Sequence, residues 1–488
     1  MPPRSRRFII AYIVLVVGPI VGLAGILRWG ATLTAPHALE AAPSLVRESP
    51  RLPGAPGADV TQLFSLILAV AAIVVACRVT GTLFRLIRQP RVVGEMFAGI
   101  FLGPSVLGAM APEFSAWLFR PSSLGSLNAL SQIGMVIFMF LVGMKIDTHE
   151  LRARGHAAVL TSHVSITFPF LLGTFLALYL YPRLSNDHVS FTSFGLFVGA
   201  AMSITAFPVL ARILTERRML ESRLGTIAVA CAAVDDVTGW SILAYIVLLI
   251  RSADAAAPMK LMLGGVIAFA VIMIAGVRPP LRRFEKTFLE RGALSESALA
   301  LILVLVLGAA LCTESLGVHA LFGAFLMGAI MPKDQRFVQY VVDRFETIVV
   351  VLLLPLFFAL TGLRTQIGLV SGVGMWVTCG AIVFVAVAGK LGGSALAAWL
   401  MGLPLKEAAA LGTLMNTRGL MELVVLNIGL DVKVISPALF SMMVLMALIT
   451  TFMTTPLLDA MGVFSQSTGV DSAVAGKVRQ SSAAQAVL

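Results

Sequence analysis

The sequence predicts an all-α membrane protein that crosses the bilayer many times. Hydrophobic residues make up 58% of the 488 residues and charged residues only 12%, and the mean hydropathy is +0.94. These values are far too apolar for an ordinary soluble domain. Apolar stretches long enough to cross about 30 Å of hydrocarbon recur along nearly the whole chain. They lack the alternation of barrel strands, so we expect them to be helices.

The first predicted span, at 8–27, follows three arginines and precedes a Pro-rich connector. It fits either a retained signal anchor or a cleaved signal peptide. We favour a retained helix, because no clear small-residue cleavage site follows it directly. This N-terminal segment, at 1–61, is expected to precede a transmembrane domain at 62–463 and a short, disordered polar tail at 464–488.

Thirteen further spans are predicted within the transmembrane domain. They are 62–77, 92–109, 126–144, 157–180, 190–211, 225–250, 261–277, 297–312, 318–331, 347–362, 373–400, 407–427 and 437–463. With a cytoplasmic N-terminus, they place 25 Lys and Arg residues on the inner side and 9 on the outer side. This asymmetry follows the positive-inside rule, and one missed span would erase it.

The predicted location is therefore the cell (inner or plasma) membrane, with many spans and a cytoplasmic C-terminus. The lipid bilayer is the expected environment of the helices. A net charge of +11 would suggest nucleic-acid binding in a soluble protein. Here the charge reflects topology, so no nucleic-acid partner is expected.

Two predicted spans contain polar interruptions at matching positions. Without the first span, thirteen remain, which fits two six-helix halves joined by one helix. Such halves run in opposite directions, as in the inverted repeats of secondary transporters. The fifth helix of each half is interrupted, and the residues concerned are Ser203, Thr205 and Pro208 in one half and Asn416, Thr417, Arg418 and Glu422 in the other.

These interruptions predict a transport site near the middle of the membrane. Pro208 has no N–H to donate to the Ile204 carbonyl, so we expect a free oxygen beside the hydroxyls of Ser203 and Thr205. Such a break is tolerated in lipid only where it lines a cavity or packs within the protein. Interrupted helices at matching positions are the best sequence indication of a transporter's binding site.

Asp235 and Asp236 are adjacent within another strongly apolar span. Consecutive helical residues point about 100° apart, so the two acids cannot face one partner. Lys390 is a lone cation in an apolar span and needs a counter-charge, so we pair it with Asp235. Asp236 is then a desolvated carboxylate on which a proton and a small cation compete. Oxygens from Asp236, from Ser203 or Thr205 and from freed carbonyls would suit Na⁺ or Li⁺.

Plainer interpretations exist for the same residues. The Asp235–Lys390 pair could be architectural, although a second acid and two broken helices make that interpretation less favoured. Arg418 and Glu422, four residues apart, could form a local helix pair, or they could stabilise the break or gate the site. No nucleophile–base arrangement or metal-ligand cluster is evident, so neither an enzyme nor a cofactor is expected.

Seven motifs closely resemble those of the second monovalent cation:proton antiporter family, which includes plant cation/proton exchangers. The resemblance covers about residues 62–460. It implies a homodimer with a dimerisation domain and a mobile core domain that works by elevator-like alternating access. The motifs are Gly94–Gly108, Phe140–Asp147, Ser203–Leu214, Val234–Trp240, Gly317–Phe325, Pro355–Leu363 and Asn416–Leu423.

The resemblance also implies roles for the charged residues. Asp236 matches the ion carrier, and Lys390 matches the partner of the first acid, Asp235. Many relatives with Asn or Gln at the first position tend to be electroneutral or to handle potassium. The Asp–Asp pair with Lys in this chain is similar to the electrogenic sodium/proton antiporters.

The expected function is coupled exchange of Na⁺ or Li⁺ for H⁺ at one shared site. A potassium/proton exchanger of the same architecture stays open, because the sequence does not reveal the size of the oxygen ring. A sodium-coupled symporter of an organic anion is disfavoured, since adjacent carboxylates would repel the anion.

Overall fold

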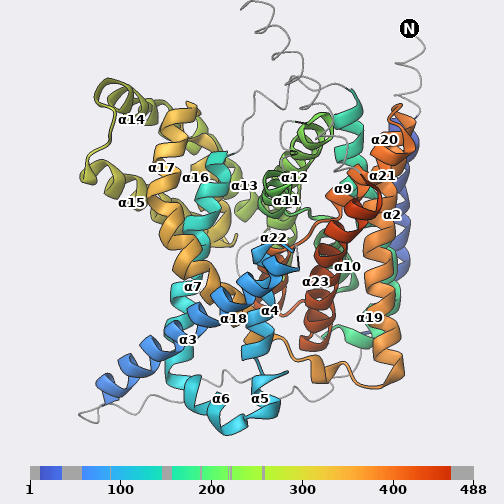
Figure 1. Cartoon of the computed structure of the whole chain (residues 1–488). Helices are drawn as coiled ribbons and strands as arrows, with labels where there is room; N and C mark the ends of the chain where they lie inside the picture. Colours follow the sequence, from blue (N-terminus) through green and yellow to red (C-terminus); the bar gives the residue numbers. More distant parts are fainter. Residues whose placement is uncertain are drawn as a thin grey trace, which may run out of the picture.

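The computed structural model describes residues 11–35, 58–87, 89–145, 156–186, 189–217, 219, 222–254 and 259–462. Every regular element among these residues is a helix (Figure 1). Eleven helical segments of this part of the chain are long and apolar enough to cross a membrane. The predicted all-α membrane protein is therefore confirmed. The Pro-rich connector at 36–57 and the tail at 464–488 lie outside the described residues.

All fourteen predicted spans correspond to helical segments. Eleven are the long segments, and the remaining three contain shorter helices. The span predicted at 190–211 consists of α10 (Phe191–Ser203) and α11 (Phe207–Glu216), and that at 407–427 of α21 (Leu405–Met415) and α22 (Leu420–Asp431). The span predicted at 318–331 is α16 (Ala320–Ile330). The two spans with polar interruptions are thus broken.

The helices form two groups that lie side by side, on the left and right of Figure 1. In the first group, α7 packs on α16, α3 on α4, and α18 on both α4 and α7. Its helices are α3 (Ala58–Leu86), α4 (Arg91–Leu102), α7 (Pro121–Lys145), α15 (Glu296–Ser315), α16, α17 (Gln335–Ile348), η3 (Val349–Leu353) and α18 (Leu354–Arg364). The short helices α5 (Leu107–Met110) and α6 (Pro112–Leu118) follow α4 at one end.

In the second group, α9 packs against α10, α12 and α20, and α20 packs on α21. The group contains both broken helices together with α9 (His156–Leu184), α12 (Arg223–Asp254), α19 (Gly372–Val387), η5 (Ala388–Gly392), α20 (Gly393–Leu400) and α23 (Pro437–Ala460). In chain order, α13 (Met259–Val271), η2 (Ile272–Val277) and α14 (Arg278–Arg291) connect α12 to α15, and η4 (Ile367–Leu369) connects α18 to α19.

Close helix contacts within the first group depend on small residues. A Cβ atom added to Gly362 of α18 would overlap the backbone of Gly99 in α4, and one added to Gly328 of α16 would overlap the Phe140 carbonyl in α7. Small residues at such crossings let backbones approach closely, which is how membrane helices gain packing contacts without a hydrophobic driving force.

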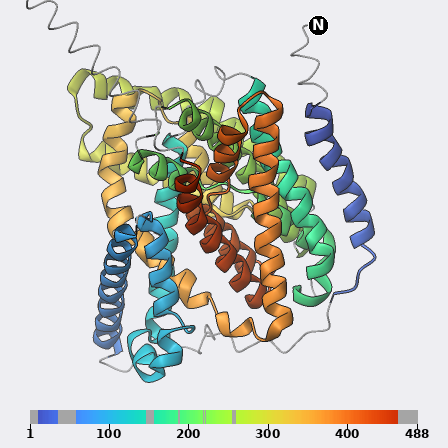
Figure 2. The ribbon, with the colours of Figure 1, turned by 45° about the vertical axis from the view of Figure 1, so that its right-hand side comes forward.

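The first hydrophobic segment is helical and lies along the outside of the second group (Figure 2). It consists of η1 (Ile13–Val17) and α2 (Gly18–Gly30). Val16 is buried against Leu160 and Val164 of α9 and Ala397 of α20. Much of the remaining surface of α2 is exposed and apolar, as it would be for a helix facing lipid.

Candidate functional site

The two broken helices meet at their non-helical residues. In the first, Ile204–Ala206 separate α10 from α11, and in the second, Asn416–Gly419 separate α21 from α22. The Ala206 N–H donates to the Thr417 carbonyl at 3.0 Å, and the Thr205 hydroxyl reaches the Met415 carbonyl at 3.3 Å. The backbone carbonyls of one break, which have no partner within their own helix, thus accept hydrogen bonds from the other break.

We expected Pro208 to interrupt a helix from within, and its position corrects that expectation. Pro208 does not sit inside a continuous helix; it lies in the first turn of α11, where a missing N–H costs nothing. The chain leaves the helical conformation earlier, at Ile204. The Ser203 hydroxyl donates back to Ala200 O at 2.8 Å, and the Ser203 carbonyl accepts a hydrogen bond from Lys390.

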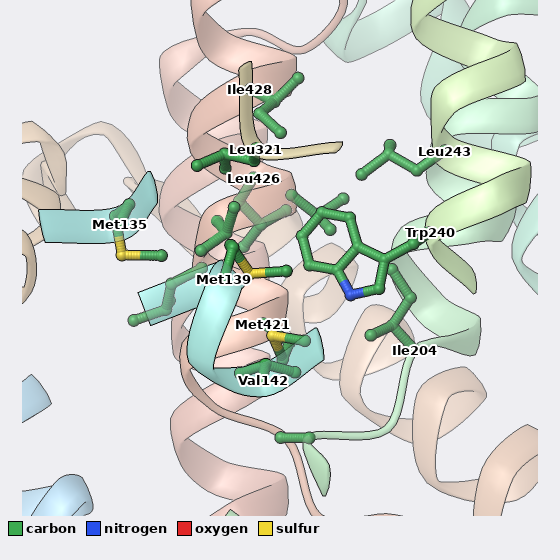
Figure 3. Close-up of a cluster of buried hydrophobic side chains, with 14 of the residues drawn as sticks. Met135, Met139, Val142, Ile204, Trp240, Leu243, Leu321, Met421, Leu426 and Ile428 are labelled. Carbon is green, nitrogen blue, oxygen red and sulfur yellow. The ribbon is translucent and has the colours of Figure 1, made fainter. Parts of the chain in front are cut away.

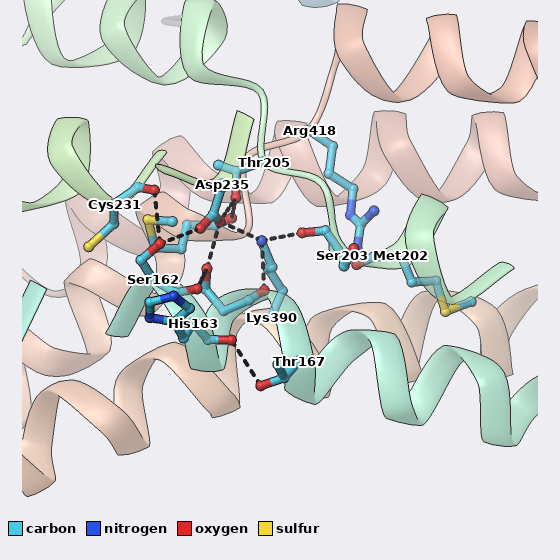
Figure 4. A network of polar contacts seen from close by, with 12 residues as sticks. Ser162, His163, Thr167, Met202, Ser203, Thr205, Cys231, Asp235, Lys390 and Arg418 are labelled. Atoms are coloured by element: carbon cyan, nitrogen blue, oxygen red, sulfur yellow. Dashed lines mark hydrogen bonds and ion pairs between the residues drawn. The ribbon is translucent and has the colours of Figure 1, made fainter. Parts of the chain in front are cut away.

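Asp235 and Lys390 are in contact, as the sequence analysis paired them. The Lys390 ammonium lies 2.9 Å from Asp235 Oδ2, and the exposed fraction of both side chains is 0%. Asp235 also accepts hydrogen bonds from Thr205 at 2.8 Å, Ser165 at 2.6 Å and Ser162 at 3.0 Å (Figure 4). Four donors thus surround this carboxylate.

The Lys390 ammonium also donates to two backbone carbonyls, Ser165 O at 2.8 Å and Ser203 O. Both carbonyls lack their helical partners for a local reason. Pro169, inside α9, has no N–H to bond the oxygen of Ser165 four residues earlier. Ser203 is the last residue of α10. Lys390 itself lies in the π-helical turn η5, an irregularity that often marks functional sites.

Sequence reasoning missed Ser162 and Ser165. They are uncharged residues in an apolar helix, and hydroxyls are common in membrane helices as packing residues. The available signal was Pro169, which frees a carbonyl at Ser165 and so predicts a polar partner beside that turn.

Arg418 combines the two roles that the sequence analysis left open. Its guanidinium pairs with Glu422 at 2.7 Å within the same segment. It also donates to the carbonyls of Ala201 at 2.9 Å and Met202 at 2.5 Å, at the C-terminal end of α10. With Lys390 on Ser203 O, two buried cations bind three consecutive carbonyls at this helix end, where the helix dipole favours positive charge.

Asp236 has a different environment from its neighbour. Its exposed fraction is only 1%, and within the described part of the chain neither carboxylate oxygen has a hydrogen-bond partner. The Phe207 N–H, in the first turn of α11, faces this carboxylate, but the contact does not meet hydrogen-bond geometry. A buried carboxylate without partners is costly unless it takes up a proton or binds a cation.

Other oxygens at the crossing are also without partners. The side-chain oxygens of Asn416 and Thr417 are buried and unsatisfied among the described residues. The described residues contain no cluster of three or more His, Cys, Asp or Glu side chains that could hold a metal ion. The crossing thus contains buried side-chain oxygens on Asp236, Asn416 and Thr417 that have no hydrogen-bond partner among the described residues.

Residues 68–460 match the family model described as "Sodium/hydrogen exchanger, transmembrane". The chain is 40% identical over 400 residues to the Na(+)/H(+) antiporter NhaS4 of Synechocystis, which covers 82% of this chain and 97% of the relative. Cation/H(+) antiporter 17 of Arabidopsis thaliana is 40% identical over 398 residues, covering 81% of this chain and 48% of the relative. K(+)/H(+) antiporter 1 of Saccharomyces cerevisiae is 33% identical over 396 residues, covering 79% and 45%. The chain thus spans about half the length of these last two relatives.

The fold is similar to a solved structure. The sodium proton antiporter MjNhaP1 of Methanocaldococcus jannaschii, at pH 8, aligns with a TM-score of 0.58 over 82% of this chain and 97% of that chain. The two sequences are only 14% identical, so this likeness concerns the fold.

Proposed function

Because this chain belongs to the transmembrane sodium/hydrogen exchanger family, it is a cation/proton antiporter, and we propose that Asp236 is the carboxylate on which its cation and proton compete. The chain is a multi-pass membrane transporter and not an enzyme, in agreement with the sequence analysis. The observation that carries the proposal is the contrast between two adjacent acids. Asp235 has four hydrogen-bond donors, whereas Asp236 has no partner among the described residues.

Competition at one carboxylate explains why the exchange is coupled. A protonated Asp236 is neutral and cannot hold a cation, and a bound cation neutralises the charge that would attract the proton. Either ligand allows the desolvated group to cross the membrane without net charge on Asp236. The empty, ionised carboxylate is disfavoured in a low-dielectric interior, so the return step without a ligand is suppressed.

We propose that the second helix group moves relative to the first in an elevator-type cycle. Both broken helices, Asp235, Asp236 and Lys390 lie in the second group. The site can therefore shift between the two sides as one body without losing its internal hydrogen bonds. The first group is then the scaffold, and it is the group through which we expect two copies to form a homodimer.

Na⁺ or Li⁺ is the cation that we favour. Carboxylate, hydroxyl and carbonyl oxygens close together suit a small, hard cation. K⁺ is the alternative, and the yeast relative named as a K(+)/H(+) antiporter supports it. In either case, exchange for protons would contribute to pH homeostasis.

The Asp235–Lys390 pair supports an electrogenic cycle. If this pair releases or binds a second proton while Asp236 exchanges the first, one net charge crosses for each Na⁺. The membrane potential would then contribute about 2.3 kcal/mol per 100 mV to each cycle. We further propose a cell-membrane location with the C-terminus in the cytoplasm, on the basis of the excess of Lys and Arg on that side.

Proton flux in proteoliposomes tests the central assignment. The purified chain should move protons when Na⁺ or Li⁺ is added, and a comparison with K⁺ identifies the preferred cation. Asp236→Asn should abolish this flux, because the amide neither binds a proton nor carries a charge for the cation. Asp459→Asn is the matched control, since Asp459 is exposed and paired with Arg217 at the surface. Near wild-type flux in Asp236→Asn would disprove the role of Asp236.

A further inference from the structure

A cavity of about 750 Å³ lies between the two helix groups. Its walls come from α7, α15, α16 and α18 of the first group and from α12 and α22 of the second. It reaches the surface beside two ion pairs that join the groups, Arg251–Glu314 at 3.0 Å and Arg364–Asp431 at 2.9 Å. Asp236 does not line the cavity. The topology from basic residues puts this end of the molecule on the outer side.

The floor of the cavity is apolar. The deepest lining residues on three of its helices are Val136 on α7, Leu321 on α16 and Val424 on α22. One helical turn deeper on the same helices lie Met139, Phe325 and Met421. The side chains of Met139 and Met421 are fully buried, and Phe325 is 9% exposed. The cavity therefore ends at a layer of large apolar side chains.

Trp240 of α12 completes this layer. It follows Asp236 by four residues, so the two side chains lie on the same face of α12, one turn apart. Farther along the same helix, Arg251 lines the cavity. Trp240 itself does not line the cavity and is 3% exposed. Along α12, the indole thus lies between the Asp236 carboxylate and the cavity.

The indole packs across the boundary between the two groups. Its ring centroid is 5.5 Å from that of Phe322 and 6.3 Å from that of Phe325, both on α16. Figure 3 shows Trp240 beside Met139 and Met421, with the cavity-lining residues Met135 and Ile428 farther out. Aromatic and thioether groups fill the space through which an ion from the cavity would reach Asp236.

We propose that Trp240 is the gate between the outer cavity and the carrier carboxylate. Packed against Phe322 and Phe325, the indole excludes water and ions from Asp236 while the groups are in this arrangement. An apolar constriction stops hydrated cations because it offers them no replacement for their water. The cavity is the aqueous route from the outer side up to this gate.

The gate opens when the second group moves, because Trp240 belongs to that group and its aromatic partners belong to the first. Movement of α12 along α16 separates the indole from both phenyl rings and brings Asp236 to the cavity. This inference rests on the proposed role of Asp236 as carrier. It adds the residue that decides when the carrier is accessible from the outside.

Side-specific thiol labelling tests the gate. Asp236→Cys is placed in a full-length background in which Cys77, Cys231, Cys312 and Cys379 are replaced by Ala. A membrane-impermeant cationic methanethiosulfonate reagent is applied to right-side-out and to inside-out vesicles. Adding Trp240→Ala should raise the labelling rate from the outer side at least tenfold and leave the rate from the inner side unchanged.

Two further variants control for misfolding. Phe325→Ala removes a partner on the opposite helix group and should also raise outer labelling. Trp399→Ala truncates an indole that is 52% exposed on α20 and should change neither rate. Unchanged outer labelling in both Trp240→Ala and Phe325→Ala would overturn the proposal. An equal rise from both sides would also overturn it, since that result indicates general loosening.

The labelling rate does not depend on transport, so it separates the gate from the proposed function. Cation-driven proton flux by the unmodified chain is measured separately, in vesicles prepared in the same way. Absence of that flux would count against the proposed function alone. Normal flux with unchanged outer labelling in the gate variants would count against the gate alone.

Discussion

Replacing Lys390 with Met should leave Asp235 as a buried carboxylate without its counter-charge. The ammonium now pairs with Asp235 at 2.9 Å and also binds the carbonyls of Ser165 and Ser203. Breaking a buried pair by removing one partner typically costs about 3–5 kcal/mol. We expect Lys390→Met to lower the free energy of unfolding by that amount. Asp235→Leu should cost about as much, because it leaves the ammonium buried without a counter-charge.

The double variant should cost much less than the sum of the two. With both charges removed, no uncompensated ion is left, and the remaining cost comes from two carbonyls at about 1–3 kcal/mol each. The hydroxyls that bind Asp235 have other acceptors within reach: Ser162 O lies 2.9 Å from the Ser165 hydroxyl, Cys231 O lies 3.4 Å from the Ser162 hydroxyl, and Met415 O lies 3.3 Å from the Thr205 hydroxyl. The coupling energy should therefore favour the pair by about 3 kcal/mol, at the upper end of the usual range.

Reversible unfolding in mixed detergent micelles, followed by circular dichroism, measures the stability of the wild type, the two single variants and the double variant. The partly exposed surface pair Arg217–Asp459 provides the control, and its coupling energy should not exceed about 1 kcal/mol. Strict additivity of Lys390→Met and Asp235→Leu would refute the reasoning. It would mean that solvent or flexible surroundings, and not the partner, compensate each charge.

Two other variants address the charge balance and the second break. Asp235→Asn should reduce the net charge moved per transport cycle. A clamped potential of 100 mV should then no longer contribute the roughly 2.3 kcal/mol per charge to the driving force that is expected of the wild type. A wild-type voltage response would count against the Asp235–Lys390 pair as a proton carrier. Gly419→Ala should destabilise the protein by about 1–3 kcal/mol, because φ is +157° and the new Cβ would lie 2.8 Å from Val209 Cγ2. Gly380→Ala on α19, with open space around it, should cost nothing when both variants are unfolded in mixed micelles and followed by circular dichroism.

Much of the fold was predictable because the bilayer restricts what a chain can do. Every backbone group in hydrocarbon needs an internal partner, so long apolar stretches must be helices, and each of the fourteen predicted spans contains helix among the described residues. The two interrupted spans were recognisable because Pro208 and the charged residues after Asn416 do not suit a continuous apolar helix. The pairing of two groups far apart in sequence, Asp235 and Lys390, followed from the cost of leaving either charge alone in the membrane.

Other features of the site could not be predicted because they depend on which backbone atoms meet. The contact of the Ser203 carbonyl with Lys390 is one example, because it depends on α10 ending at that residue. Ser162 and Ser165 carry no charge and so gave no signal in an apolar helix. Arg418 could have served only Glu422; its contact with the end of α10 depends on how the two broken helices cross.

The sequence by itself determined that this protein is a polytopic helical transporter, with two adjacent acids and one lysine at membrane depth. These features could be predicted because hydrophobicity, helix breakers and isolated charges each act within a single span. Only the tertiary structure decided that Asp235 is surrounded by four donors while Asp236 is left without a partner among the described residues. The reason is that a side chain's partners are set by how helices cross, and a rotation of 100° between neighbouring residues gives two identical acids different surroundings.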